Sequence, residues 1–335
     1  MLKAVPYTGL DELLDDDLRF EDIRSSPSGR TLVVVATNGI ICLFAADTSS
    51  RPVRITRHVE LSSASLASPH GVDFLSEDVI VVANRAAWLT FYRIPNVDAW
   101  QGRINVEPIH EMDSVWFGRK GATRNLEGRD VSCGPGSVRV YGKHLFVSCN
   151  NLNTVTAHPY RLQQQTIETG DGAVVAQSGL EIPDGISISR DGRRMAVSNH
   201  NDHGVVVYRT TDKTQSCVLR DVDLRYPHGL CFDPTGRALY VADAGERHVH
   251  VFFNPDGEWD KPCDRSAFKL PAVGMEAFRK TKEAAGEEKY RALEGGIKGI
   301  DVDPSGRIVV TTCRHQTLRF FEAAVATVES AFAAE

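Results

Sequence analysis

The sequence predicts an all-β protein, a six-bladed β-propeller that forms a single domain over residues 1–335. Three observations lead to this fold class. One pattern of strands and turns occurs six times along the chain. The copies follow one another at intervals of roughly 44–70 residues, which leaves room for three or four strands and tight turns in each. The last copy holds only three strands, so a segment from elsewhere in the chain is needed to complete it.

The repeated pattern begins with a small or polar residue and a glycine. An alternating strand, a turn of the type Asp/Ser-Pro-x-Gly, a hydrophobic strand, a polar turn and a third alternating strand follow. The clearest copies begin at Tyr226, Ile182 and Gly296, and fainter ones begin at Phe20, Ser68 and Gly134. The first turns contain the pairs Ser28-Gly29, Asp191-Gly192, Thr235-Gly236 and Ser305-Gly306, which are typical of hairpin turns.

The first strand of each copy is expected to be the innermost strand of a blade. Alignment of the copies puts the starts of these strands at Glu21, His70, Gly136, Asp184, His228 and Lys298. A glycine follows several of these positions, as Gly71 and Gly185 do. Because glycine has no Cβ, it suits the close approach of backbones that is expected around a crowded axis.

Two of the intervals are long and contain insertions, at about 111–133 and 271–297. The second insertion predicts a helix near 274–294. Both insertions fall just before an inner strand, so we expect them beside one mouth of the central channel, as two walls of a sheltered site. The alternative is that they only decorate the surface.

The N-terminal segment is expected to close the ring. The last copy is followed by the tail AAVATVESAFAAE and not by a fourth strand. An open outer edge would expose unpaired backbone groups. Residues Leu2–Tyr7 are therefore predicted to form the outer strand of the sixth blade.

Charge and composition exclude several classes of partner. A formal net charge of -6 and a pI near 6.0 argue against nucleic acid, because no basic stripe would neutralise phosphates. No apolar run approaches the roughly 20 residues that span a bilayer, and the N-terminus lacks the apolar region of a secretory signal. Seven cysteines, several in or beside predicted strands, suit reduced thiols. We expect a cytoplasmic protein that acts on a small-molecule substrate, and its oligomeric state stays open.

Polar residues at the inner strand starts are the candidates for a functional site. Because the inner strands converge on the axis, five side chains are expected to meet around one cavity: Glu21, His70, Asp184, His228 and Lys298. Carboxylates and imidazoles gathered in this way offer metal ligands. Lys298 would either contact an anionic substrate or pair with the carboxylates, which would leave no metal. Four residues that end second strands on the same face are expected to bind substrate or to form turns: Asn84, Asn150, Asn199 and His200.

Two copies resemble repeats of known propellers. The segment YPHGLCFDPTGRALYVADAGERHVHVF from Tyr226 is similar to an NHL repeat, and EIPDGISISRDGRRMAVSN from Glu181 is similar to a blade of the senescence-marker-protein/gluconolactonase group. The resemblance covers essentially the whole chain and implies one divalent cation, calcium or zinc, at the channel mouth. By this resemblance Glu21 and Asp184 hold the cation. In our hypothesis His228 is the third ligand, and His70 moves protons. Lys298 would be the second catalytic residue.

The tripeptide Pro-His-Gly occurs at His70 and at His228. It resembles peptidylglycine amidating lyase, in which histidines from several inner strands hold zinc. Blades two and five lie opposite each other, so one ion between these histidines requires a narrow channel. Our first hypothesis is a metal-dependent hydrolase of a small polar ester or lactone. The alternatives are a metal-dependent lyase and a non-catalytic propeller of NHL type that binds a ligand or a protein.

Overall fold

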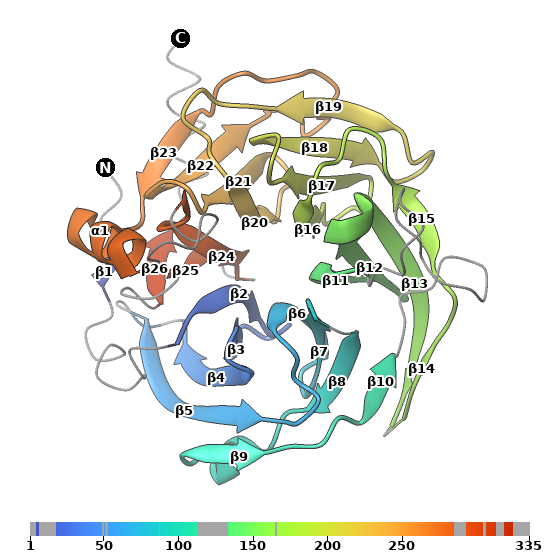
Figure 1. The fold of residues 1–335 in the computed structure, drawn as a ribbon, viewed down its shortest axis with the longest axis vertical. Coiled ribbons are helices and arrows are strands. Elements are labelled where there is room, and N and C mark those ends of the chain that lie inside the picture. The colour runs from blue at the N-terminus through green and yellow to red at the C-terminus, as the bar shows by residue number, and fades with distance from the viewer. Residues whose placement is uncertain are drawn as a thin grey trace.

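The chain folds into a β-propeller, in which sheets stand around a central axis (Figure 1). The structure, a computed structural model, describes residues 5–6 and 18–323, except for 49, 51–52, 87, 113–132, 165, 285–292, 304–305 and 313–317. The strands in these residues form six sheets of four or five strands each. The predicted all-β class and propeller architecture are therefore confirmed.

Five of the sheets are complete blades. The first contains β2 (Phe20–Ser25), β3 (Thr31–Ala36), β4 (Ile40–Asp47), β5 (Arg54–Ser62) and the parallel strand β9 (Arg103–Asn105). The second contains β6 (Pro69–Ser76), β7 (Val79–Asn84), β8 (Leu89–Arg93) and β10 (His110–Met112). The third contains β11 (Pro135–Tyr141), β12 (His144–Cys149), β13 (Thr154–Gln163), β14 (Thr166–Thr169) and β15 (Ala173–Ala176). The fourth contains β16 (Pro183–Ile188), β17 (Arg194–Asn199), β18 (Gly204–Arg209) and β19 (Gln215–Leu219). The fifth contains β20 (Pro227–Phe232), β21 (Ala238–Asp243), β22 (His248–Phe253) and β23 (Phe268–Pro271).

The sixth sheet is less complete. It consists of β24 (Ile297–Val302), β25 (Arg307–Thr312), β26 (Arg319–Glu322) and β1 (Val5–Pro6). The outer strand β1 pairs with β26 over only two residues. The N-terminal segment thus lies where the prediction put it, but the rest of Leu2–Tyr7 is outside the described residues. The structure has five complete blades rather than the predicted six; in the described residues the outer strand of the last sheet comprises only Val5–Pro6.

One α-helix occurs in the described part of the chain, α1 (Met275–Ala284). It lies within the predicted region 274–294, of which residues 285–292 fall outside the described residues. Phe278 of α1 packs on the hydrophobic cluster between the fifth and sixth sheets. The helix therefore packs on these two sheets at the outer rim of the ring (Figure 1). Of the other predicted insertion, residues 113–132 also fall outside the description.

The core consists of layers between neighbouring sheets. Successive residues of a strand point to opposite faces. On β3, Val33 and Val35 therefore pack against the second sheet, whereas Leu32 and Val34 share a cluster with residues of the sixth sheet. The middle strands are buried on both faces, which explains why they read as continuous apolar runs such as TLVVVA.

Glycine is required where the inner strands meet. A Cβ at Gly185 would lie 2.2 Å from the backbone oxygen of His228 in the next sheet, and one at Gly71 would lie 2.6 Å from Cα of Ser137. No side chain tolerates such distances, so the predicted close approach of the backbones is confirmed. Gly192 adopts a φ of 72°, the left-handed conformation that its hairpin turn requires.

Within the residues that the structure describes, no helix is long and apolar enough to cross a membrane. The cysteines in this part of the chain, which include Cys42, Cys149 and Cys231, are all free thiols. Cys313 lies outside it.

Candidate functional site

The six inner strands stand around the central axis (Figure 1), and each contributes one residue to a cluster at one end of the channel. Each comes from the second residue of its strand, and these residues are Glu21, His70, Gly136, Asp184, His228 and Lys298. At this position the pairing of every inner strand with its neighbour is irregular. Such a bulge re-aims a side chain. The five side chains expected to meet do so, and all are buried.

Glu21, His70 and His228 form a compact group, the His–Glu group. One ligand atom of each lies within 4.8 Å of the others, so the three could hold a metal ion. The ring centroids of His70 and His228 are 4.9 Å apart. The channel is therefore narrow enough for histidines from opposite blades to contact one ion. Glu21 Oε2, His70 Nε2 and His228 Nε2 are buried without a hydrogen-bond partner. Because buried polar atoms rarely lack partners, three that converge indicate a place for a ligand.

Gly136 sets the orientation of His70. His70 Nδ1 lies 2.6 Å from the backbone oxygen of Gly136. A carbonyl oxygen only accepts hydrogen bonds, so Nδ1 carries the proton and donates it. Nε2 then faces Glu21 Oε2, which is 3.3 Å away. A backbone carbonyl commonly orients a metal-binding histidine in this way.

Asp184 lies beside the His–Glu group and is not a member of it. Its Oδ2 is 3.3 Å from His228 Nε2, and its Oδ1 is 3.2 Å from Arg85 Nη2. The compact group thus differs from the ligand set that the sequence suggested, because it contains His70 in place of Asp184. Burial alone would raise the pKa of Asp184, but His228, His70 and Arg85 hold that pKa well below its usual range. Asp184 therefore stays ionised and compensates nearby positive charge.

Lys298 and Arg19 balance the charge of Glu21. Lys298 Nζ lies 3.5 Å from Oε2, and Arg19 Nε lies 3.1 Å from Oε1. Burial alone would raise the pKa of Glu21, but these cations and His70 hold it well below its usual range. Burial lowers the pKa of His228 well below its usual range, although Asp184 opposes the shift. The group therefore combines an ionised carboxylate with a neutral His228 imidazole, the forms in which both residues bind metals.

Glu294 belongs to the site and was missed by the sequence analysis. It pairs with Lys298, and its carboxylate oxygens lie 3.3 Å from Arg19 Nη2 and 3.1 Å from His200 Nε2. Burial alone would raise the pKa of Glu294, but Lys298 and His200 hold it well below its usual range. The available signal was its place at the end of the insertion 271–297. That insertion does contribute to the site, as expected.

Two of the four predicted substrate contacts lie at the site. His200 stands between Glu294 and Asp184, with its Nδ1 3.8 Å from Asp184 Oδ2 and its ring 5.1 Å from that of Tyr226. Asn150 donates from Nδ2 to Asp184 Oδ1 at 3.4 Å, while its Oδ1 has no partner. Both residues therefore adjoin the His–Glu group through Asp184.

The other two, Asn84 and Asn199, use their amides inside their own blades. Asn84 accepts from the backbone N of Ala67 at 3.0 Å and donates to the backbone oxygen of Trp88 at 3.0 Å. Asn199 donates to the backbone oxygen of Gly179 at 2.8 Å. Both side chains are fully buried. They tie loops to strand ends, so the turn-forming alternative accounts for them.

Arg85 connects the site with solvent. Its guanidinium contacts Asp184, yet 42% of its side chain is exposed. Its only signal in the sequence was that it directly follows Asn84 at a strand end. With Arg85, the site contains three carboxylates and three cations: Glu21, Asp184, Glu294, Arg19, Arg85 and Lys298.

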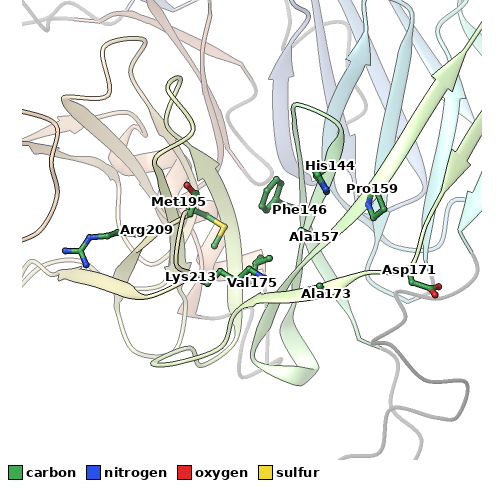
Figure 2. Close-up of a pocket in the computed structure, with 11 residues that line it drawn as sticks. His144, Phe146, Ala157, Pro159, Asp171, Ala173, Val175, Met195, Arg209 and Lys213 are labelled. Carbon is green, nitrogen blue, oxygen red and sulfur yellow. The ribbon is translucent and has the colours of Figure 1, made fainter.

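Two cavities lie away from this site. One of about 320 Å³ lies between the third and fourth sheets, lined by Phe146, Met195 and Val175 with Arg209 and Lys213 at its edge (Figure 2). No residue of the site lines it. The other, of about 280 Å³, is lined by residues further along all six inner strands.

Comparison with known proteins assigns no family. No protein-family model matches the chain, and no curated protein matches it. The NHL and gluconolactonase resemblance therefore rests on its motifs alone, and the functional argument rests on the geometry of the site.

Proposed function

We propose that the protein is a metal-dependent hydrolase that acts on a small polar ester or lactone at this mouth of the channel. The observation that supports the proposal is the His–Glu group, whose ligand atoms converge, are buried and lack hydrogen-bond partners. Leaving buried polar atoms without hydrogen bonds costs free energy, which a bound ion would offset. Three protein ligands also leave a coordination position for another ligand, as in catalytic and not structural zinc sites.

The ligand types favour zinc over calcium. Two of the three are imidazole nitrogens, which zinc accepts, whereas calcium takes six to eight oxygen ligands. When bound, such an ion polarises a carbonyl group and lowers the pKa of water. Glu21, His70 and His228 are the residues that would hold it.

His200 is the residue that we propose to move protons. Glu294 lies 3.1 Å from His200 Nε2, while His200 Nδ1 has no hydrogen-bond partner. A carboxylate that holds one ring nitrogen leaves the lone pair of the other nitrogen available, which is the arrangement of a general base. His70, to which the sequence assigned this role, is a ligand in this proposal.

Arg85 is proposed to contact the substrate. The carboxylates and cations of the site are equal in number, so a divalent ion would leave it with net positive charge. That charge would stabilise the oxyanion that develops when an ester carbonyl is attacked. Arg85 is the half-exposed cation of the set, whereas Lys298 is 3% exposed and is held by Glu21 and Glu294.

We also infer that the incomplete sixth sheet functions as the sixth blade of an NHL-type ring. Its inner strand β24 contacts both β20 and β2, which are the inner strands of the fifth and first blades. It also supplies Lys298 to the site. The ring of inner strands is therefore continuous around the axis.

Metal content tests the proposal. Protein purified without chelators or a histidine tag should contain about one zinc ion per chain by inductively coupled plasma mass spectrometry. His228→Ala should lose the ion. His203→Ala is the matched control, because His203 packs 4.8 Å from Tyr226 at the same end of the channel but lies outside the His–Glu group. If zinc is still absent after it has been added back, the proposal is wrong, and the ion pairs of Lys298 favour a metal-free binding propeller.

A lyase is the second candidate, because both Pro-His-Gly histidines belong to the His–Glu group. The two reactions differ in their use of water. Turnover in oxygen-18-labelled water adds one labelled oxygen to a hydrolysis product, whereas a lyase forms an unsaturated or carbonyl product without consuming water. Mass spectrometry of the products distinguishes the two reactions.

A further inference from the structure

The cavity of about 280 Å³ lies at the opposite end of the channel from the His–Glu group. It is lined by the fifth residue of every inner strand, and these residues are Arg24, Asp73, Arg139, Ser187, Cys231 and Asp301. Three residues further along a strand correspond to a shift of about 10 Å. The cavity is therefore separate from the site described above, and we call it the arginine cavity.

The carboxylates that line the arginine cavity already accept hydrogen bonds from the backbone. Asp73 accepts from the backbone N of Phe74 at 2.8 Å and from that of Val140, in the next blade, at 2.7 Å. Asp301 likewise accepts from the backbone N of Ser25 at 2.7 Å. These carboxylates bind neighbouring inner strands to each other.

The two guanidinium groups that line the same cavity have N–H donors without hydrogen-bond partners. Arg24 donates from Nη1 to the backbone oxygen of Ile300 at 2.7 Å, and Arg139 donates from Nη1 to that of Val72 at 3.3 Å. Each guanidinium is thus anchored by one nitrogen to a neighbouring blade. The remaining nitrogens, Arg24 Nε and Nη2 and Arg139 Nη2, are buried and have no hydrogen-bond partner.

We propose that the arginine cavity binds a small oxyanion, a carboxylate or a tetrahedral phosphate-type group, between Arg24 and Arg139. Both residues are more than nine-tenths buried, at 4% and 8% exposure. A guanidinium presents its N–H groups in a planar fork that matches the oxygens of such anions. The cavity offers surplus donors and no surplus acceptors, which selects an acceptor-rich ligand. The inference does not depend on the metal or on the proposed hydrolysis.

Charge makes this binding depend on pH. The charged and titratable groups around Asp73 come from four other inner strands. They are Arg24 and Asp22 from β2, Arg139 from β11, Cys231 from β20 and Asp301 from β24. Burial raises the pKa of Asp73 to about 7 in spite of Arg24. Protonation of this carboxyl group as the pH falls removes a negative charge from the cavity. Oxyanion binding should therefore be tighter at pH 6 than at pH 8.

Isothermal titration calorimetry of the full chain tests the proposal. Sodium sulfate and sodium acetate are titrated separately, with sodium chloride at equal ionic strength as the reference. We expect one saturable site for sulfate or acetate but not for chloride, and the tighter of the two identifies the shape of the anion. Arg139→Lys, which keeps the charge but loses the fork, should weaken that binding by about tenfold or more.

A matched variant separates this site from general attraction to positive charge. Arg194 of β17 is as buried as Arg139, but it is paired with Glu258 and Asp260 from the loop between β22 and β23. Arg194→Lys should leave sulfate binding unchanged. Asp73→Asn should tighten binding at pH 8 and reduce its dependence on pH. Equal affinity in wild type and Arg139→Lys, or no saturable oxyanion binding at pH 6, would overturn the inference.

Discussion

A residue of an inner strand acquires its role from its position along that strand. The second residues face one mouth of the channel, and the fifth residues face the other. In a regular strand, positions that differ by three point to opposite faces. The irregular pairing at the second residue shifts this alternation, so that both positions can face the axis. One short strand can therefore contribute to two sites.

The pair of His200 and Glu294 provides a prediction at this scale. His200→Ala should lower kcat about 100-fold, because the proposed base is removed. Zinc content should be unchanged, since His200 lies outside the His–Glu group. Added imidazole should restore part of the activity. A variant that loses zinc along with activity would contradict the assignment and would make His200 a structural support of the group.

At the scale of the element, the third blade contains a buried polar side chain away from the axis. His158 on β13 is fully buried, and its Nε2 lies 3.0 Å from Thr156 Oγ1 while Nδ1 lacks a partner. A Cβ at Gly172 would lie 2.1 Å from the His158 ring, so the chain packs tightly there. Burial lowers the pKa of His158 to about 4 from its ordinary value of 6.5. His158 is therefore neutral in the folded protein at neutral pH.

Stability should consequently fall in acid. Between about pH 6.5 and pH 4, the unfolded chain binds a proton at His158 that the folded chain does not. The free energy of unfolding should decrease by up to about 1.4 kcal/mol per pH unit in this window through His158 alone. Urea unfolding at pH 7, 6 and 5 measures the slope. His158→Gln should have a shallower slope, and equal slopes in wild type and His158→Gln would contradict the prediction.

At the scale of the whole molecule, the ring depends on the contact between its two ends. The pairing of β1 with β26 joins the start of the chain to the last sheet. Deletion of residues 1–8 should lower the melting temperature by several degrees, because it exposes the outer edge of the sixth sheet. Replacement of residues 1–8 by a Gly-Ser segment of equal length should have the same effect, which separates strand pairing from chain length. An unchanged melting temperature in both variants would show that the ring does not need this strand.

The fold could be predicted largely from the sequence because its signals are local. Strand alternation, hairpin glycines and the glycines after the inner strand starts repeat with the blades, and each is visible within a few residues. The convergence of Glu21, His70, Asp184, His228 and Lys298 followed from this repetition, since equivalent positions in a ring face the same axis. Asn84 and Asn199 show the limit of that reasoning. They end β7 and β17, where they pair with the first residue of the inner strand, and their amides bind loops of their own blades. Asn150 lies one residue beyond the end of β12, the place that Arg85 and His200 occupy in their blades.

The sequence by itself determined the propeller, its inner strands and the residue types at one mouth of the channel, because these depend on patterns within single repeats. Only the tertiary structure decided that His70, and not Asp184, completes the His–Glu group, and that Glu294 and Arg85 adjoin it. It also decided that the sixth sheet is incomplete and that Arg24 and Arg139 face a second cavity. These features depend on distances between side chains of different blades. Such distances are set by the closure of the ring and the packing of the sheets, which no local pattern encodes.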